Sequence, residues 1–257
     1  MDSTPLLELN GITKRHVGRA ALDDVSLSVP AGTLLALVGP SGSGKTTLLK
    51  TINRLVEPDS GSVRLGGDDV RSLSAAALRR RIGYVFQGIG LFPHMDVVDN
   101  IAIVPRLNGV PEAERRARAL ELLDLVALPR DFAARHPAAL SGGQAQRVGV
   151  ARALAAKPSL MLMDEPFGAL DPVTRDELGR TYRALHDSLG LTTILVTHDM
   201  TEALLLADRI VVLIEGRIRA DSAPAALLRG DLDAEVRALI EVPRRQAERL
   251  AELERGA

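Results

Sequence analysis

The fold of this chain is decided by the stretch Gly39-Pro40-Ser41-Gly42-Ser43-Gly44-Lys45-Thr46. It matches the pattern G-x-x-x-x-G-K-[ST], which is a phosphate-binding P-loop when it connects a strand to the start of a helix. The apolar residues 34–38 predict a buried strand just before the loop, and residues 47–55 predict a helix just after it. Because the full pattern lies in this context, we expect a nucleotide-binding loop.

Several groups of this loop suit a nucleotide phosphate. Its glycines let backbone N–H groups approach an anion because no Cβ stands in the way, and the helix start adds partial positive charge. Lys45 is expected to reach the β- and γ-phosphates, and the Thr46 hydroxyl is expected to ligate Mg²⁺. The predicted nucleotide-binding residues of this region are Gly39, Pro40, Ser41, Gly42, Ser43, Gly44, Lys45, Thr46 and Thr47.

A second apolar strand, predicted over residues 160–165, ends in two acidic residues. Parallel sheets bind ligands at the carboxyl ends of their strands, so Asp164 is a predicted Mg²⁺ ligand. Glu165 follows it and is a candidate general base for activating water. Taken alone, Asp-Glu-Pro after a strand is also a common strand-ending turn.

Leu140-Ser141-Gly142-Gly143-Gln144 predicts a further helix start with exposed N–H groups. Ser141 suits the N-cap position, and such a helix start is a second candidate anion site. A plain serine-capped helix is the alternative interpretation of the same residues.

The stretch 140–144, a short distance before the acidic strand, resembles the signature of ATP-binding-cassette (ABC) ATPases. Gln87, after the apolar strand 82–86, is similar to the Q-loop glutamine of that family. Asp171 lies in a stretch similar to the D-loop, and His198 follows a strand as the switch histidine does. The resemblance spans about residues 6–225, and the motifs occur in the family's order.

The resemblance implies an α/β fold with a RecA-like P-loop core, an antiparallel β edge and an inserted α-helical subdomain at about residues 95–156. The alternating pattern of residues 6–35 agrees with antiparallel strands. Residues 160–215 return to strand–helix–strand alternation, which predicts a parallel sheet.

We expect a single ABC ATPase domain over residues 1–230 and a charged helical tail over residues 231–257. Breaks in the helical pattern are predicted at Pro105, at Gly109-Val110-Pro111 and at Pro129 within the subdomain, and at Pro243 within the tail.

In the family that the chain resembles, two cassettes pair head to tail around ATP and Mg²⁺. This implies a homodimer in which ATP lies between the Lys45 loop of one subunit and Ser141 and Gly143 of the other. The resemblance also implies that Asp171 is one of the residues that contact the nucleotide.

The resemblance also assigns the hydrolytic residues. Glu165 would polarise the attacking water, and His198 would position the γ-phosphate. Gln87 would sense Mg²⁺ and the γ-phosphate. His16 stands where the family commonly places an aromatic residue that stacks on adenine, and an exposed histidine at a strand end is the alternative.

Composition agrees with a cytosolic ATPase, and any link to a membrane must come through partners. The resemblance implies a location on the inner face of the cell membrane, through the permease. The formal net charge of −1 gives no reason to expect nucleic acid as a partner. The absence of cysteine excludes disulfides and thiolate metal sites. No apolar run has the length of a membrane span, and the N-terminus lacks the features of a secretory signal.

The predicted function is the ATP-hydrolysing subunit of an importer, with integral-membrane permeases as partners and, indirectly, a solute-binding protein. Residues 51–61, 87–95 and 100–105 are similar to the corresponding segments of glycine betaine, choline and carnitine importers. A quaternary amine is therefore the expected substrate. The alternatives are an amino-acid importer and a soluble ABC ATPase without a transport role.

Overall fold

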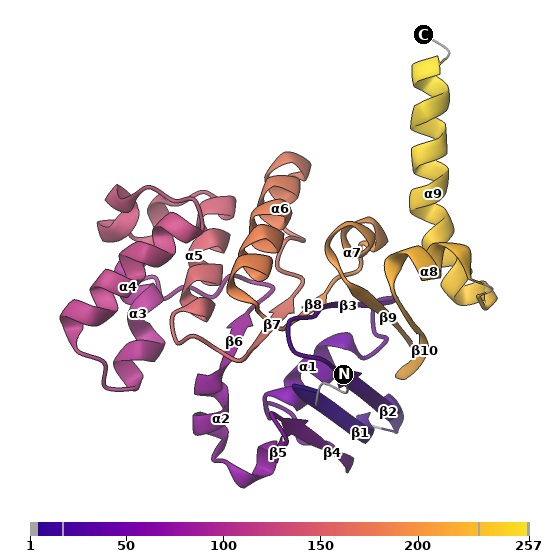
Figure 1. The fold of residues 1–257 in the computed structure, drawn as a ribbon, viewed down its shortest axis with the longest axis horizontal. Helices are drawn as coiled ribbons and strands as arrows, with labels where there is room; N and C mark the ends of the chain where they lie inside the picture. The colour runs from indigo at the N-terminus through magenta and orange to yellow at the C-terminus, as the bar shows by residue number, and fades with distance from the viewer. Residues whose placement is uncertain (1–4, 17, 231, 256–257) are drawn as a thin grey trace.

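Two sheets organise the computed structural model, which describes residues 5–16, 18–230 and 232–255 (Figure 1). The strands of the four-stranded sheet run in the order β2-β1-β4-β5, and those of the six-stranded sheet in the order β10-β9-β3-β8-β7-β6. The smaller sheet contains β1 (Leu7–His16), β2 (Arg19–Val29), β4 (Ser60–Leu65) and β5 (Asp68–Asp69). All its pairings are antiparallel, as the alternating pattern predicts.

The six-stranded sheet is parallel except at its β10 edge. It contains β3 (Leu34–Val38), β6 (Ile82–Val85), β7 (Leu160–Asp164), β8 (Thr193–Val196), β9 (Arg209–Ile214) and β10 (Arg217–Ser222). Every residue of β3, β7 and β8 is buried. These strands are covered on both faces, which explains their near-continuous apolar sequence. The mixed α/β fold with an antiparallel edge is therefore confirmed.

The α-helices pack into three core clusters. The helices are α1 (Lys45–Ile52), α2 (Ala75–Arg81), α3 (Val97–Leu107), α4 (Glu112–Leu125), α5 (Gly142–Leu154), α6 (Pro172–Leu189), α7 (Met200–Leu206), α8 (Pro224–Arg229) and α9 (Ala234–Arg255). Helices α1 and α2 share a core with strands of both sheets, and α6 shares a core with α3, α4 and α5. Helices α3, α4 and α5 gather on one side, beyond β6, whereas α7, α8 and α9 lie towards β9 and β10 (Figure 1).

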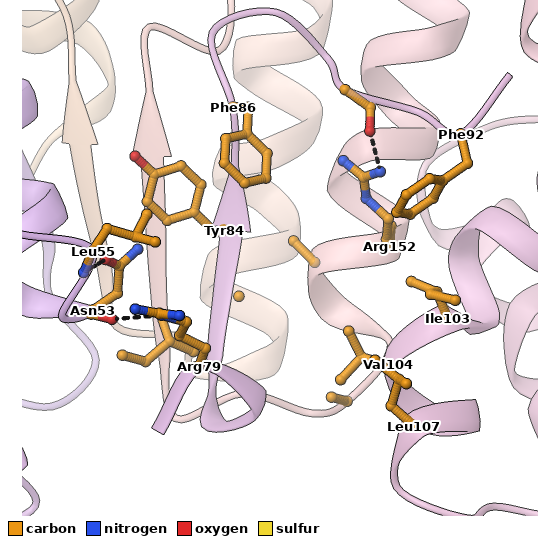
Figure 2. Close-up of a pocket in the computed structure, with 15 residues that line it drawn as sticks. Asn53, Leu55, Arg79, Tyr84, Phe86, Phe92, Ile103, Val104, Leu107 and Arg152 are labelled. Carbon is orange, nitrogen blue, oxygen red and sulfur yellow. Dashed lines mark hydrogen bonds between the residues drawn. The ribbon is translucent and has the colours of Figure 1, made fainter. Parts of the chain in front are cut away.

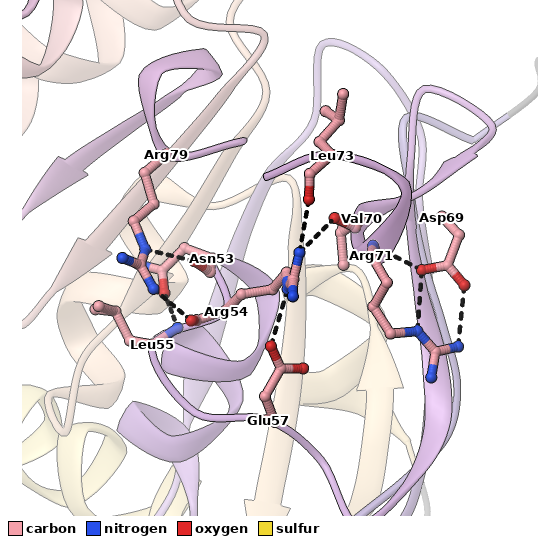
Figure 3. Close-up of polar contacts among 9 residues, drawn as sticks. All are labelled: Asn53, Arg54, Leu55, Glu57, Asp69, Val70, Arg71, Leu73 and Arg79. Carbon is pink, nitrogen blue, oxygen red and sulfur yellow. Dashed lines mark hydrogen bonds and ion pairs between the residues drawn. The ribbon is translucent and has the colours of Figure 1, made fainter. Parts of the chain in front are cut away.

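The sequence pattern predicts the helix after the P-loop over residues 47–55. In the structure α1 begins two residues earlier, at Lys45, and ends three residues earlier, at Ile52. Arg54 adopts a left-handed conformation with φ 56°, which cannot continue a helix. Its side chain holds the turn by donating to the carbonyl oxygens of Leu73 at 2.8 Å and Val70 at 3.3 Å (Figure 3). Arg79 donates from Nε to the carbonyl of Asn53 at 3.1 Å.

The predicted breaks at residues 109–111 and at Pro129 are confirmed, because these residues lie outside α3 and α4. The predicted interruptions at Pro105 and Pro243 are wrong. Pro105 lies inside α3 and Pro243 inside α9. Proline removes one backbone donor, but Pro105 stands in the last turn of α3, where the chain closes through Asn108 N–H to Val104 O at 3.0 Å. Val236 and Ile240, at the start of α9, are buried in one core cluster with residues of β3 and β9.

Candidate active site

The P-loop runs from the end of β3 to α1, as the sequence predicts. Two of its glycines are required by close packing. A Cβ at Gly39 would overlap the carbonyl oxygen of Leu213, and one at Gly44 would overlap that of Ala21. Gly44 also has φ 106°, a conformation that other residues rarely adopt. A Cβ at Gly42 would meet nothing within 4 Å, so this part of the loop is open to a ligand.

Lys45, the first residue of α1, is buried, and its side chain points back into this loop. Its Nζ donates to the carbonyl oxygens of Gly39 at 2.8 Å and Pro40 at 2.9 Å. Burial lowers the pKa of the Lys45 ammonium, and the charges of Glu165 and Asp164 act in the opposite direction. The loop therefore holds a cation among its own carbonyl groups, near the carboxylates of Asp164, the last residue of β7, and Glu165, the residue after it.

Thr46 and Asp164, two of the three predicted Mg²⁺ ligands with Gln87, are in direct contact. Thr46 Oγ1 donates to Asp164 Oδ1 at 3.0 Å. Burial raises the pKa of Asp164, while the hydrogen bond from Thr46 acts to lower it. This donor set fits Mg²⁺, which prefers oxygen ligands and is usually bound by one or two carboxylates together with substrate phosphates.

Tyr84 is a site residue that the sequence reasoning missed. Its hydroxyl donates to Asp164 Oδ2 at 3.4 Å, and burial is the main cause that raises its pKa. Tyr84 lies on β6, which pairs with β7 and places Tyr84 opposite Leu162. Its position on the strand before Gln87 was the feature of the sequence that could have indicated it.

Gln87, Glu165 and His198 come together from three separate segments. Gln87 Nε2 donates to Glu165 Oε2 at 3.1 Å, and His198 Nδ1 lies 3.3 Å from the same oxygen. Glu165 has φ 46°, which is unusual for a residue with a side chain. Its N–H donates to Val196 O at 3.0 Å, so β8 holds this backbone in place. Strained backbone of this kind is found at functional sites.

Ser141, Gly143 and Asp171 form a second group. Ser141 caps α5 through a reciprocal capping box with Gln144, as its sequence predicts. Asp171 caps α6 by accepting the N–H of Thr174 at 3.1 Å. A Cβ at Gly143 would collide with the side chain of Thr174, so the two helix starts are packed together. Within the described residues, no hydrogen bond or ion pair connects Ser141 or Asp171 to the P-loop.

His16 is the last residue of β1 and is exposed. It pairs with Arg19 in the β1–β2 hairpin. This hairpin approaches the P-loop through Ala21, next to Gly44. No hydrogen bond or ion pair between His16 and the P-loop occurs in the described part of the chain, so stacking on adenine stays a prediction.

Comparisons with known proteins agree with this geometry. The family model described as ABC transporter matches residues 22–168. The choline transport ATP-binding protein OpuBA of Bacillus subtilis is 48% identical over 229 residues, which cover 89% of this chain and 60% of that protein. The sulfate/thiosulfate import ATP-binding protein CysA of Burkholderia mallei is 52% identical over 226 residues, covering 84% of this chain and 64% of that protein.

A solved structure is similar as well. It is a dimeric structure of the ATP-binding cassette MJ0796 in a post-hydrolysis state, bound to ADP and Pi. Its TM-score is 0.76 and its sequence identity is 34%, covering 85% of this chain and 98% of that one.

The fold and the P-loop define a mixed α/β nucleotide-binding protein with the ABC ATPase fold. The chain belongs to the ABC transporter family. It spans 60% of the length of OpuBA, the first curated relative named above. None of the helices within residues 5–16, 18–230 and 232–255 combines the length and apolar content of a membrane span.

Proposed function

We propose that this chain is the ATP-hydrolysing subunit of an ABC importer. The observation that carries the proposal is the convergence of Gln87 and His198 on one oxygen of Glu165, at 3.1 and 3.3 Å, beside the Thr46–Asp164 pair. A carboxylate held between a polar amide and an imidazole, close to a phosphate-binding loop, is suited to activating water against a γ-phosphate.

Each residue has a separate task in this chemistry. Lys45 and the P-loop N–H groups bind the β- and γ-phosphates, and Glu165 accepts the proton of the attacking water. His198 orients the γ-phosphate. Gln87 holds the carboxylate of Glu165 in place through its hydrogen bond to Oε2. When bound, Mg²⁺ neutralises charge on the phosphate oxygens, and Thr46, Asp164 and Gln87 are its proposed ligands. The protein's contribution is mainly positioning and charge stabilisation.

The second group of residues fits a composite site. The exposed start of α5 at Ser141 and Gly143 presents N–H groups that suit a phosphate. We place these groups, with Asp171, on the γ-phosphate side of ATP held by the P-loop of a second copy. ATP would then close a head-to-tail homodimer, and hydrolysis would let it open. The dimeric MJ0796 structure supports this arrangement by analogy.

A groove beside Gln87 provides a docking surface for a permease. Its volume is about 330 Å³, and it lies between β6 and α3 (Figure 2). Its lining is mostly apolar and includes Leu55, Tyr84, Phe86, Phe92, Ile103, Val104 and Leu107. Phe86 directly precedes Gln87 and Leu107 is 57% exposed. An apolar segment of a membrane partner in this groove would reach both the Gln87 segment and the helices α3 and α5.

Leu107→Glu is expected to release the permease, because a charge buried in an apolar contact without a partner is costly. Co-purification of the permease should fall strongly, whereas ATP binding by the isolated subunit should be unchanged. Leu125→Glu is the matched control, since Leu125 is a 39% exposed leucine at the end of α4 outside the groove. Equal permease recovery with both variants would contradict docking in this groove.

The substrate class that we propose is a quaternary amine such as glycine betaine, choline or carnitine. The three segments that resemble the corresponding importers supply six of the fifteen residues that line the groove. These are Asn53, Leu55, Gly90, Phe92, Ile103 and Val104. Residues at this surface would match the permease rather than ATP, which is how an ATPase sequence can indicate a substrate class. The 48% identity to OpuBA supports this choice.

Sulfate or thiosulfate is the second candidate, because the identity to CysA is 52%. The two candidates can be separated in a strain that lacks this chain and other uptake systems for the tested solutes. Loss of labelled choline or glycine betaine uptake is expected, with labelled sulfate uptake unchanged. Wild-type protein should restore uptake, and Lys45→Ala should not, because the phosphates lose their cation. Loss of sulfate uptake alone would reassign the substrate and leave the ATPase assignment intact.

We further propose the cytoplasmic face of the membrane as the location, with attachment through the permease and with a solute-binding protein as an indirect partner. The organisation that we propose is one cassette over residues 1–230, including a helical subdomain at about residues 95–156, followed by a charged tail over residues 231–257.

A further inference from the structure

Arg175, near the start of α6, contacts two loops that carry proposed site residues. Its Nη2 donates to the carbonyl of Leu170 at 3.0 Å, and its Nη1 lies 3.7 Å from Asp199 Oδ2. Leu170 directly precedes Asp171, and Asp199 directly follows His198. One guanidinium group therefore spans the distance from the Asp171 loop to the His198 loop.

Asp199 transmits this contact to the backbone around His198. Its Oδ1 caps α7 by accepting the N–H groups of Thr201 at 2.8 Å and Glu202 at 3.2 Å. The Asp199 N–H donates to Thr197 Oγ1 at 3.0 Å, and the Thr197 hydroxyl donates to Glu202 Oε2 at 3.0 Å. His198 lies between Thr197 and Asp199, so this network holds the backbone on both sides of the imidazole.

Arg175 and Glu202 each keep one buried polar atom without a hydrogen-bond partner among the described residues, namely Arg175 Nε and Glu202 Oε1. Both residues line a cavity of about 340 Å³ between α6 and α7. Burial raises the pKa of Glu202 to about 7, while Thr197 and the charge of Arg175 act to lower it. An unpaired buried donor is unfavourable, and both unpaired atoms belong to residues that line this cavity.

We propose that Arg175 is a positioning residue that couples the Asp171 loop to His198. The inference rests on the proposed function, in which Asp171 faces the second protomer and His198 stands beside Glu165. A second protomer that shifts the Asp171 loop moves the Leu170 carbonyl, and Arg175 follows it. The contact between Arg175 and Asp199 then sets the position of the imidazole. Hydrolysis thereby depends on the presence of the second protomer, although Arg175 itself touches no nucleotide.

The test measures ATP hydrolysis against ATP concentration for Arg175→Met, Arg175→Lys and Arg180→Met. Arg175→Met is expected to lower kcat by about ten- to hundredfold, because small misplacements of a catalytic group have effects of this size. Its Hill coefficient should fall towards one, with ATP affinity unchanged. Arg175→Lys should restore part of kcat, since an ammonium can meet Asp199 but cannot also reach Leu170. Arg180→Met is the matched control, because Arg180 is 78% exposed and pairs with Asp176 on the same helix.

A double variant separates coupling from a general structural defect. The kcat of Arg175→Met combined with Asp199→Asn should be no lower than that of Arg175→Met alone, because each change breaks the same Arg175–Asp199 contact. The inference is overturned when Arg175→Met keeps the wild-type kcat and Hill coefficient, when it matches Arg180→Met, or when kcat and ATP affinity fall together. Wild-type protein that hydrolyses no ATP would overturn the proposed function as well, so the two failures can be told apart.

Discussion

Glu165→Gln is expected to lower kcat for ATP hydrolysis by about 10²- to 10⁴-fold, the usual contribution of a general base. ATP affinity should be unchanged, because Lys45 and the P-loop N–H groups bind the phosphates independently of this carboxylate. A glutamine can keep contacts with Gln87 and His198, which lie 3.1 and 3.3 Å from Glu165 Oε2, so the geometry should persist. Release of phosphate measures turnover, and calorimetry measures ATP binding.

Glu121→Gln serves as the control for the loss of a carboxylate. Glu121 is exposed on α4 and pairs with Arg118 of the same helix at 3.2 Å. This control should hydrolyse ATP at the wild-type rate. Near-wild-type turnover by Glu165→Gln would show that Glu165 is not the base and that its contacts with Gln87 and His198 have another purpose.

The parts of the site that lie next to a strand end could be predicted from the sequence. The P-loop and Glu165 directly follow buried strands, Asp164 is the last residue of β7, and His198 lies two residues after β8. Parallel strands bring their carboxyl ends to one edge of the sheet. The pairing of β3 with β8, and of β7 with β8, places these strand ends beside one another. A local pattern is therefore enough, because the fold itself supplies the long-range juxtaposition.

The parts that depend on long side chains could not be predicted in this way. Arg175 meets Asp199 from 24 residues earlier in the chain, and Tyr84 meets Asp164 across the pairing of β6 with β7. Neither residue belongs to a pattern whose spacing fixes its partner. The length of α1 was misjudged for a similar reason, since Arg54 stops the helix through contacts with residues 70 and 73. Residues 70 and 73 follow β5, so these contacts depend on the tertiary structure and not on a local sequence pattern.

Ser141→Arg, introduced into Glu165→Gln, is expected to abolish the ATP-dependent dimer. With ATP and without hydrolysis, the Glu165→Gln protein should accumulate as a homodimer that light scattering detects. Arginine at position 141 adds bulk and removes the cap of α5, where Ser141 Oγ accepts the Gln144 N–H at 3.3 Å. If Ser141 and Gly143 contact ATP of the other subunit, the two protomers can no longer close around it.

Loss of a helix cap costs about 0.5–2 kcal/mol by itself, so the cap and the composite site must be separated. Ser74→Arg in the same Glu165→Gln background does this, because Ser74 caps α2 by accepting the Ala77 N–H at 3.2 Å and is exposed. That variant should lose a comparable cap and still dimerise with ATP. Equal dimer content in all three proteins would exclude Ser141 from the interface, and hydrolysis would then have to be explained within a single protomer. A dimer lost on Ser141→Arg alone, with ATP binding intact, would place the start of α5 against the nucleotide of its partner.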